Sequence, residues 1–153
     1  MRRIVRLAVA AGLAGLGCSV MDAQAAGLCD AVPAASVASI LAEPGTLIPN
    51  PTHLGCDYNL GKGGKVSVMV TVQTDSFSVT NFNDSYAMTK DEKISGVGDA
   101  AWLGAAATFQ GTTVQTLNFR AGRKIISVST GSLTGPVSKD AFVKLGALFA
   151  AKG

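Results

Sequence analysis

Histidine, tryptophan and charged side chains are scarce in this sequence. Its 153 residues include one His, one Trp and only 15% charged residues, with no run of like charge. The composition therefore gives little support to histidine-based catalysis or to a polybasic surface that binds nucleic acid. We expect no nucleic-acid partner. The hydrophobic fraction of 48% is too high for a disordered chain, so the composition predicts one globular unit.

Cysteine is also rare, and its three positions, Cys18, Cys29 and Cys56, show no Cys-x-x-Cys spacing. A structural zinc site needs four ligands, and only His53 lies near one of these cysteines. The sequence therefore predicts neither a metal nor any other cofactor.

The N-terminus has the three parts of a secretory signal peptide. Three arginines come first, an apolar stretch follows over residues 7–21, and a small-x-small cleavage site ends at Ala25. The apolar stretch is shorter than the roughly 17 to 25 residues that a membrane span needs. We predict a signal peptide over 1–25, a single domain over 26–153, no stable membrane span, and a periplasmic or extracellular location.

Gly17-Cys18 offers an alternative processing site. A small residue before cysteine is typical of a lipoprotein box, which would place a lipid anchor on Cys18 and hold the protein at the membrane. Upstream, Gly15 stands where Leu is usual and Leu16 where a small residue is usual. The cut after Ala25 is favoured, and lipidation stays open as the alternative.

Either cut leaves Cys29 and Cys56 as a pair in an exported domain. In an oxidising compartment such a pair most simply forms a disulfide. On the chain-entropy account a bridge of this span contributes roughly 3 to 4 kcal/mol to stability.

Hydrophobic periodicity predicts an α+β fold. A 3.6-residue period favours helices over 30–42 and, with Ser138 as N-cap, up to Phe149, and a weaker one over 76–89. Residues 47–54, with Pro49-Asn50-Pro51, are predicted to form a loop, and 90–93 a charged loop. Alternating apolar residues predict strands over 56–60, 65–74, 100–103, 112–120 and 124–130. This order fits an antiparallel sheet of about four to five strands with helices packed on one face.

Two glycine clusters resemble phosphate-binding motifs. Gly96-Val97-Gly98-Asp99-Ala100-Ala101 matches the loose dinucleotide fingerprint, but no strand is expected before it and no helix after it. The cluster Gly61–Lys65 lacks the spacing and hydroxyl residue of a phosphate loop. Both are predicted to be turns, with an anion nest at Gly61–Lys65 as the alternative.

Several short motifs together resemble a known family. They are a Cys before a short helix, Cys56-Asp57-Tyr58 opening a strand, the turn Gly96–Trp102, a hairpin over Leu117–Val128 and a C-terminal helix. This combination resembles the small exported bacterial lipoproteins and envelope proteins classed as domain of unknown function 3558, and it covers most of the predicted domain. The resemblance implies an exported, disulfide-bonded α+β domain with a Cys29–Cys56 pair and no recognised activity.

Two functions from different classes remain. The favoured one is a noncatalytic binding or protein-interaction module whose partner is an exported or envelope protein, or a small ligand. Tyr58, Tyr86 and Trp102 are its candidate surface residues, because aromatic side chains concentrate at interfaces. The alternative is a small hydrolase-like exported enzyme using His53, Asp57 and a serine, although no Gly-x-Ser-x-Gly elbow is present.

Overall fold

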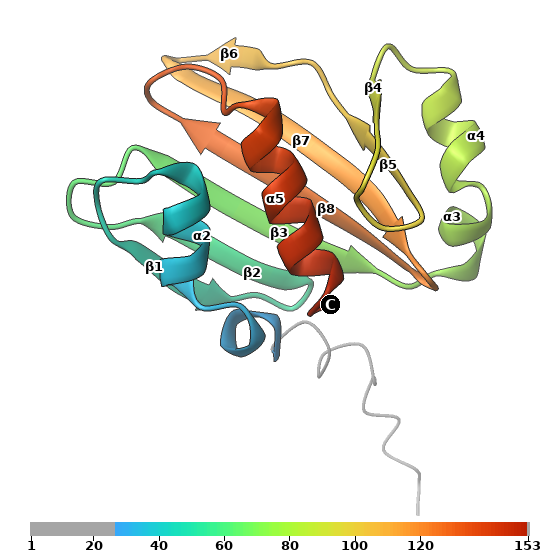
Figure 1. Ribbon diagram of the computed structural model, residues 1–153, viewed down its shortest axis with the longest axis horizontal. Helices are drawn as coiled ribbons and strands as arrows, with labels where there is room; N and C mark the ends of the chain where they lie inside the picture. The colour runs from blue at the N-terminus through green and yellow to red at the C-terminus, as the bar shows by residue number, and fades with distance from the viewer. Residues whose placement is uncertain (1–26, 153) are drawn as a thin grey trace, which may run out of the picture.

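A computed structural model describes residues 27–152 of the chain (Figure 1). The predicted signal peptide, the cut after Ala25 and Cys18 lie outside these residues. After a helical turn over residues 27–31, the elements follow in the order given next. They are α2 (Ala34–Leu41), β1 (Leu47–Pro51), β2 (Gly55–Leu60), β3 (Val66–Gln73), α3 (Ser76–Thr80), α4 (Phe82–Ala87), β4 (Glu92–Ile94), β5 (Ala100–Leu103), β6 (Ala107–Phe109), β7 (Thr112–Ala121), β8 (Lys124–Ser132) and α5 (Lys139–Ala150).

The strands form one antiparallel sheet in the order β1-β2-β3-β8-β7-β5-β4, with β6 also pairing with β7. Helices α2 and α5 lie together on one face of this sheet, and α5 crosses the central strands obliquely (Figure 1). The mixed helix and strand content and the antiparallel sheet confirm the predicted fold class.

The core fills the space between the sheet and these two helices. It combines the alternating valines of β3 and alternate residues of β7 and β8 with Val37 of α2 and Phe142, Leu145 and Phe149 of α5. The period-two pattern of the strands and the 3.6-residue stripe of α5 thus meet as one buried layer. Ser138 caps α5 as predicted, because its side chain accepts a hydrogen bond from the Ala141 N–H.

The sheet has eight strands in the described chain rather than the predicted four to five. One extra strand is β1, which lies where a loop was predicted and pairs with β2 from Leu47↔Leu60 to Pro51↔Cys56. Prolines are tolerated there because β1 is an edge strand. The others are β4, three residues long, and β6, which pairs with β7 one residue out of the register of β5. This one-residue shift is the signature of a bulge.

The predicted helix over 30–42 is interrupted. Its main segment, α2, starts only after Pro33, whose φ of −61° suits a helix N-terminus. Val32 before it is fully buried. The residue before a proline is biased away from helical geometry, which explains why the helical turn over 27–31 does not continue into α2.

The Cys29–Cys56 disulfide is present, with its Cα atoms 5.3 Å apart. It ties the turn over residues 27–31 to β2. Beside it, the hydroxyl of Tyr58 donates a 2.8 Å hydrogen bond to the carbonyl of Val32. The N-terminal end of the domain is therefore fixed to the sheet by one covalent and one polar contact.

Both glycine clusters form turns. Gly96 and Gly98 adopt positive φ between β4 and β5, and a Cβ on Gly98 would lie 2.2 Å from the carbonyl oxygen of Arg120. The motif is followed by a strand, which excludes a dinucleotide loop. Gly63, also at positive φ, lies in the turn between β2 and β3.

Among residues 27–152, no helix combines the length and the apolar character that crossing a membrane requires.

Candidate functional site

The two faces of the sheet differ in what covers them. Strand residues that alternate with the core residues point away from α2 and α5. We call the outward side chains of β1, β2, β3 and β6, of residues 112–116 of β7 and of residues 127–133 at the end of β8 the open face. No described helix packs over this area.

Five apolar side chains stand on the open face. They are Ile48, Met69, Val114 and Leu133, which are 56%, 48%, 43% and 55% exposed, and Phe109, which is 72% exposed. Small and hydroxyl side chains lie between them, since Met69 aligns with Ser129 and Thr116, and Ser67 aligns with Gly131 and Val114. The result is a surface on which apolar, small and hydroxyl side chains alternate.

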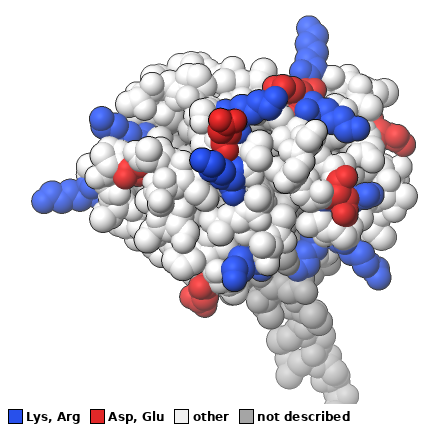
Figure 2. Space-filling model, viewed as in Figure 1, with Lys and Arg blue, Asp and Glu red and all other residues white. Residues whose placement is uncertain are grey.

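Charge is almost absent from the open face. Its only charged side chains are Asp57 on β2 and Lys65, the residue before β3. A solvated face of an antiparallel sheet is normally polar, and depletion of charge is instead typical of the core of a protein interface. On the opposite side, which carries α2 and α5, acidic and basic side chains are interspersed (Figure 2).

The edge strands of the sheet are poorly suited to pairing with another strand, because β4 and β6 are only three residues long and β1 carries two prolines. The Thr52 N–H donates to the carbonyl of Gly55, so the backbone N–H and C=O groups of the even-numbered residues of β1 point toward β2. Pro49 and Pro51 therefore lie at positions that face the free edge, where they offer no N–H donor. At the far edge β4 is only three residues long and carries Glu92 and Lys93. Contact with another protein is thus directed to the open face.

One corner beyond the open face is covered. Ile125 points away from the core yet is only 5% exposed, and α3 contacts β8 there. Phe82 of α4 is also buried and packs against Tyr86 with ring centroids 4.9 Å apart. The segment α3–α4 therefore covers the corner at the β7–β8 turn.

The three aromatic residues predicted for an interaction surface lie outside the open face, although Trp102 of β5 points to the same side of the sheet, next to Asn118 of β7. Tyr58 is fully buried and packs against Phe149, so its prediction as a surface residue is wrong: its position in β2 points into the core. Tyr86 and Trp102 are half-buried. The indole Nε1 of Trp102 is buried without a hydrogen-bond partner among the described residues, and Lys93 Nζ lies 5.9 Å from its ring centroid.

The shifted pKa values have structural causes. Burial raises the pKa of Tyr58 to about 12. Burial, and then the charge of Asp91, raises the pKa of Tyr86. The backbone N–H of Ser78 lowers the pKa of Asp75, the N-cap of α3. Each shift is explained by packing or capping, and none marks an acid–base pair.

The residues of the hydrolase-like hypothesis do not assemble. His53 is exposed in the turn between β1 and β2, and no described carboxylate lies within ion-pair distance of it. Asp57 lies on the open face, paired across the strands with Asn50 and Met69. Within residues 27–152 there is also no group of three His, Cys, Asp or Glu residues arranged to hold a metal ion.

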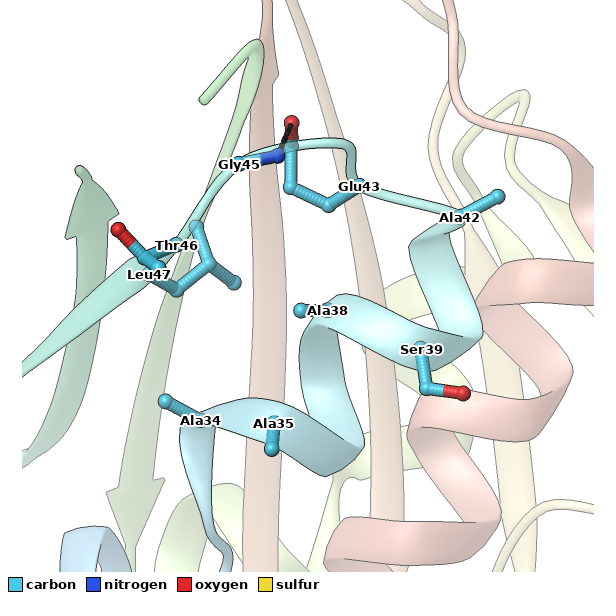
Figure 3. A pocket seen from close by; sticks show the side chains of 9 residues that line it. All are labelled: Ala34, Ala35, Ala38, Ser39, Ala42, Glu43, Gly45, Thr46 and Leu47. Carbon is cyan, nitrogen blue, oxygen red and sulfur yellow. Dashed lines mark hydrogen bonds between the residues drawn. The ribbon is translucent and has the colours of Figure 1, made fainter. Parts of the chain in front are cut away.

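A shallow pocket of about 510 Å³ lies between α2 and the start of β1 (Figure 3). Alanine methyl groups of α2, the hydroxyl of Ser39 and the side chain of Leu47 line it. Its one acidic residue, Glu43, is already used by the fold. Its carboxylate accepts hydrogen bonds from the backbone N–H groups of Gly45, Lys65 and Val66.

Glu43 occupies backbone donors next to the cluster Gly61–Lys65, for which an anion nest was the alternative prediction. The backbone donors of Lys65 and Val66 bind the Glu43 carboxylate, with Lys65 N at 2.9 Å from Oε1. These donors therefore bind a carboxylate of the chain itself, and the pocket beside them is left with mainly apolar walls and the hydroxyl residues Ser39 and Thr46.

No family model, no curated protein and no solved structure matches this chain. The resemblance to domain of unknown function 3558 remains a prediction from the motifs.

Sequence reasoning missed the open face. The signal was present in β3, where Ser67, Met69 and Thr71 alternate with the buried valines and carry no charge. A solvated strand usually shows Lys, Glu or Arg at such positions. Which other strands extend this uncharged surface depends on the strand order, which the sequence does not state.

Proposed function

We propose that this protein is a noncatalytic protein-interaction module of the exported or envelope class, working in the periplasm or outside the cell, and that the open face is its binding surface. The observation that carries the proposal is a nearly uncharged face of the sheet with five exposed apolar side chains. Exposed apolar surface of this kind marks interaction sites in soluble proteins. Export is inferred from the N-terminal sequence and agrees with the disulfide.

The edge strands define the mode of binding. Addition of a peptide strand needs a free row of backbone donors and acceptors. The proline-bearing edge of β1 and the three-residue strands β4 and β6 do not offer a row long enough. The partner therefore docks its own apolar surface on the face of the sheet.

The test is capture of a partner from a native envelope extract on oxidised protein, with Val114→Arg as the probe variant. Val114 is exposed on the open face, between Ala107 of β6 and Gly131 of β8, so arginine there leaves the core untouched but places an unpaired charge in the interface. We expect the wild type to capture one saturable partner, and the purified partner to bind the variant at least tenfold more weakly.

Phe77→Arg is the matched control. Phe77 is 78% exposed on α3, outside the open face, so the same added charge must leave binding unchanged. Equal losses in both variants, or no loss in Val114→Arg, would contradict the proposal.

The alanine-lined pocket supports a second candidate function, binding of a small apolar ligand. Its walls are mainly apolar, and the lining residues Ser39 and Thr46 carry hydroxyls for polar contacts. Ala38→Leu would fill the pocket, since Ala38 lies on α2 facing it (Figure 3). Loss of binding to an aliphatic probe such as a medium-chain alcohol in this variant, with binding kept in Val114→Arg, would favour this candidate.

A further inference from the structure

The open face also carries features that fit a particular partner. We propose that this partner is a second copy of the same chain, and that two copies stack their open faces around a two-fold axis. The inference rests on the proposed function, because it names the occupant of the same surface. The arrangement of apolar and charged residues about one row of the sheet carries it.

That row runs across the strands through Ser67, Gly131 and Val114, whose positions are aligned by the register. A two-fold axis along this row places each Val114 against its own copy. It also places each row of one copy against the row of the other copy that lies at the same distance on the opposite side of the axis. The middle of the contact would consist of small side chains, which lets two sheets approach to about 10 Å.

The apolar residues match under this operation. On one side of the axis row, Met69 aligns with Ser129 and Thr116. On the other side, the Leu133 N–H donates to the carbonyl of Lys65, which places Leu133 beside the start of β3. Rotation about the axis keeps each strand over the same strand of the other copy, so Met69 of one copy lies over Lys65 of the other and beside its Leu133, twice per dimer.

The two charges match as well. Asp57 lies in the row of Met69, and Lys65 lies in the row of Leu133, on the other side of the axis. β2 and β3 are neighbouring strands, so the carboxylate of one copy meets the ammonium of the other across adjacent strands. Like charges are kept apart, because Asp57 faces no second Asp57. An arbitrary partner would not be expected to place its charges so well.

The covered corner does not obstruct this arrangement. The α3–α4 segment lies beyond the end of β3, on the side of Gln73 and Ile125. With the axis through the row of Ser67, the Gln73 end of β3 lies beyond the Val66 end of β3 in the other copy. The α3–α4 segment therefore lies outside the contact. The open face spans six strands spaced about 4.8 Å apart, giving on the order of 700 Å² per copy, near the ~800 Å² of a standard interface.

The experiment is a charge exchange read out by light scattering after size exclusion, or by sedimentation, on the oxidised domain without the predicted signal peptide. We expect the wild type to show twice the monomer mass. Asp57→Lys and Lys65→Glu should each shift the protein toward monomer, since each sets like charges against one another. The double variant should restore the dimer, because the pair is re-formed with its signs reversed.

Controls separate assembly from folding. Far-UV circular dichroism must be unchanged in the single variants, and their urea midpoints must equal that of the wild type diluted until it is monomeric, because dissociation alone lowers the midpoint of a dimer. Phe77→Arg must remain dimeric. A wild type that stays monomeric up to its solubility limit would overturn the dimer, as would a double variant no better than the singles. If that monomer still binds another exported protein through Val114, the proposed function stands without the dimer; if Val114→Arg affects no binding, both fail.

Discussion

At the scale of single residues, buried polar groups reveal more than exposed ones. Tyr58 was expected at a surface because tyrosines favour interfaces, yet its hydroxyl is buried and satisfied by the carbonyl of Val32. A buried hydroxyl that donates to a carbonyl has a structural role, since removing it leaves the carbonyl without a partner. Tyr58 thus supports the segment that the disulfide also holds.

Replacing Tyr58 with Phe is expected to lower the free energy of unfolding by about 1 kcal/mol. Phenylalanine keeps the aromatic ring in the core, so the decrease in the free energy of unfolding reports the loss of the hydrogen bond to Val32. Urea unfolding at neutral pH measures it. A variant as stable as the wild type would show that the carbonyl finds another donor.

Tyr58 also predicts an alkaline transition. Burial raises its pKa to about 12 from the ordinary value of 10.0. The unfolded chain therefore loses this proton first, and the free energy of unfolding falls as the pH rises from about 10 to 12. The loss approaches about 2 to 3 kcal/mol, from the shift alone. Subtracting the same titration of Tyr58→Phe isolates this residue, and parallel curves would contradict the assignment.

At the scale of elements, side-chain contacts fix how the helices and strands meet. The Glu43 carboxylate follows the end of α2 and accepts hydrogen bonds from backbone donors at the start of β3. It thereby joins two elements that are separated in the chain by β1 and β2. Glu43, the residue after the C-cap of α2, therefore connects the helix to the sheet.

Glu43→Ala is expected to cost about 1 to 3 kcal/mol, because backbone donors lose a charged acceptor. Glu92→Ala is the matched control. This variant removes the ion pair between Glu92 and Lys139 of α5. Both side chains are more than half exposed, so the free energy of unfolding is expected to fall by less than about 1 kcal/mol. Thermal unfolding compares the two variants. Equal decreases in stability would show that the backbone hydrogen bonds of Glu43 contribute no more than an exposed ion pair.

The disulfide acts at the same scale, since it joins the N-terminal turn to β2. Cys29 and Cys56 are 27 positions apart, so replacing both with Ser is expected to cost roughly 3 to 4 kcal/mol through the entropy of the unfolded chain. Urea unfolding of the oxidised protein against the double variant measures it. An oxidised protein that gains nothing over the variant would show that native contacts already restrict this segment.

At the scale of the whole molecule, processing of the N-terminus decides where the protein works. If the signal peptide is cut after Ala25, the exported protein begins at Ala26 and is unmodified. Intact mass of protein recovered from the envelope tests this directly. A lipid-bearing N-terminus at Cys18 would contradict the cut, and would tether the open face close to a membrane.

The sequence alone determined much of this protein. The valines of β3, the stripe of α5 and the cap at Ser138 encode their own elements, because period and capping are local properties. The disulfide followed from the number of cysteines and the predicted export signal. Edge strand β1 was missed because Pro49 and Pro51 carry a loop signal locally, while the pairing with β2 that makes them a strand is not local.

Only the tertiary structure decided which surface is open. A residue such as Met69 or Val114 is exposed or buried according to the layer packed over its face of the sheet, and that depends on where α2, α5 and α3–α4 come to rest. The uncharged surface is assembled from strands distant in the chain, in an order set by cross-strand pairing. Local patterns specify elements, whereas a binding surface forms only when those elements are brought together.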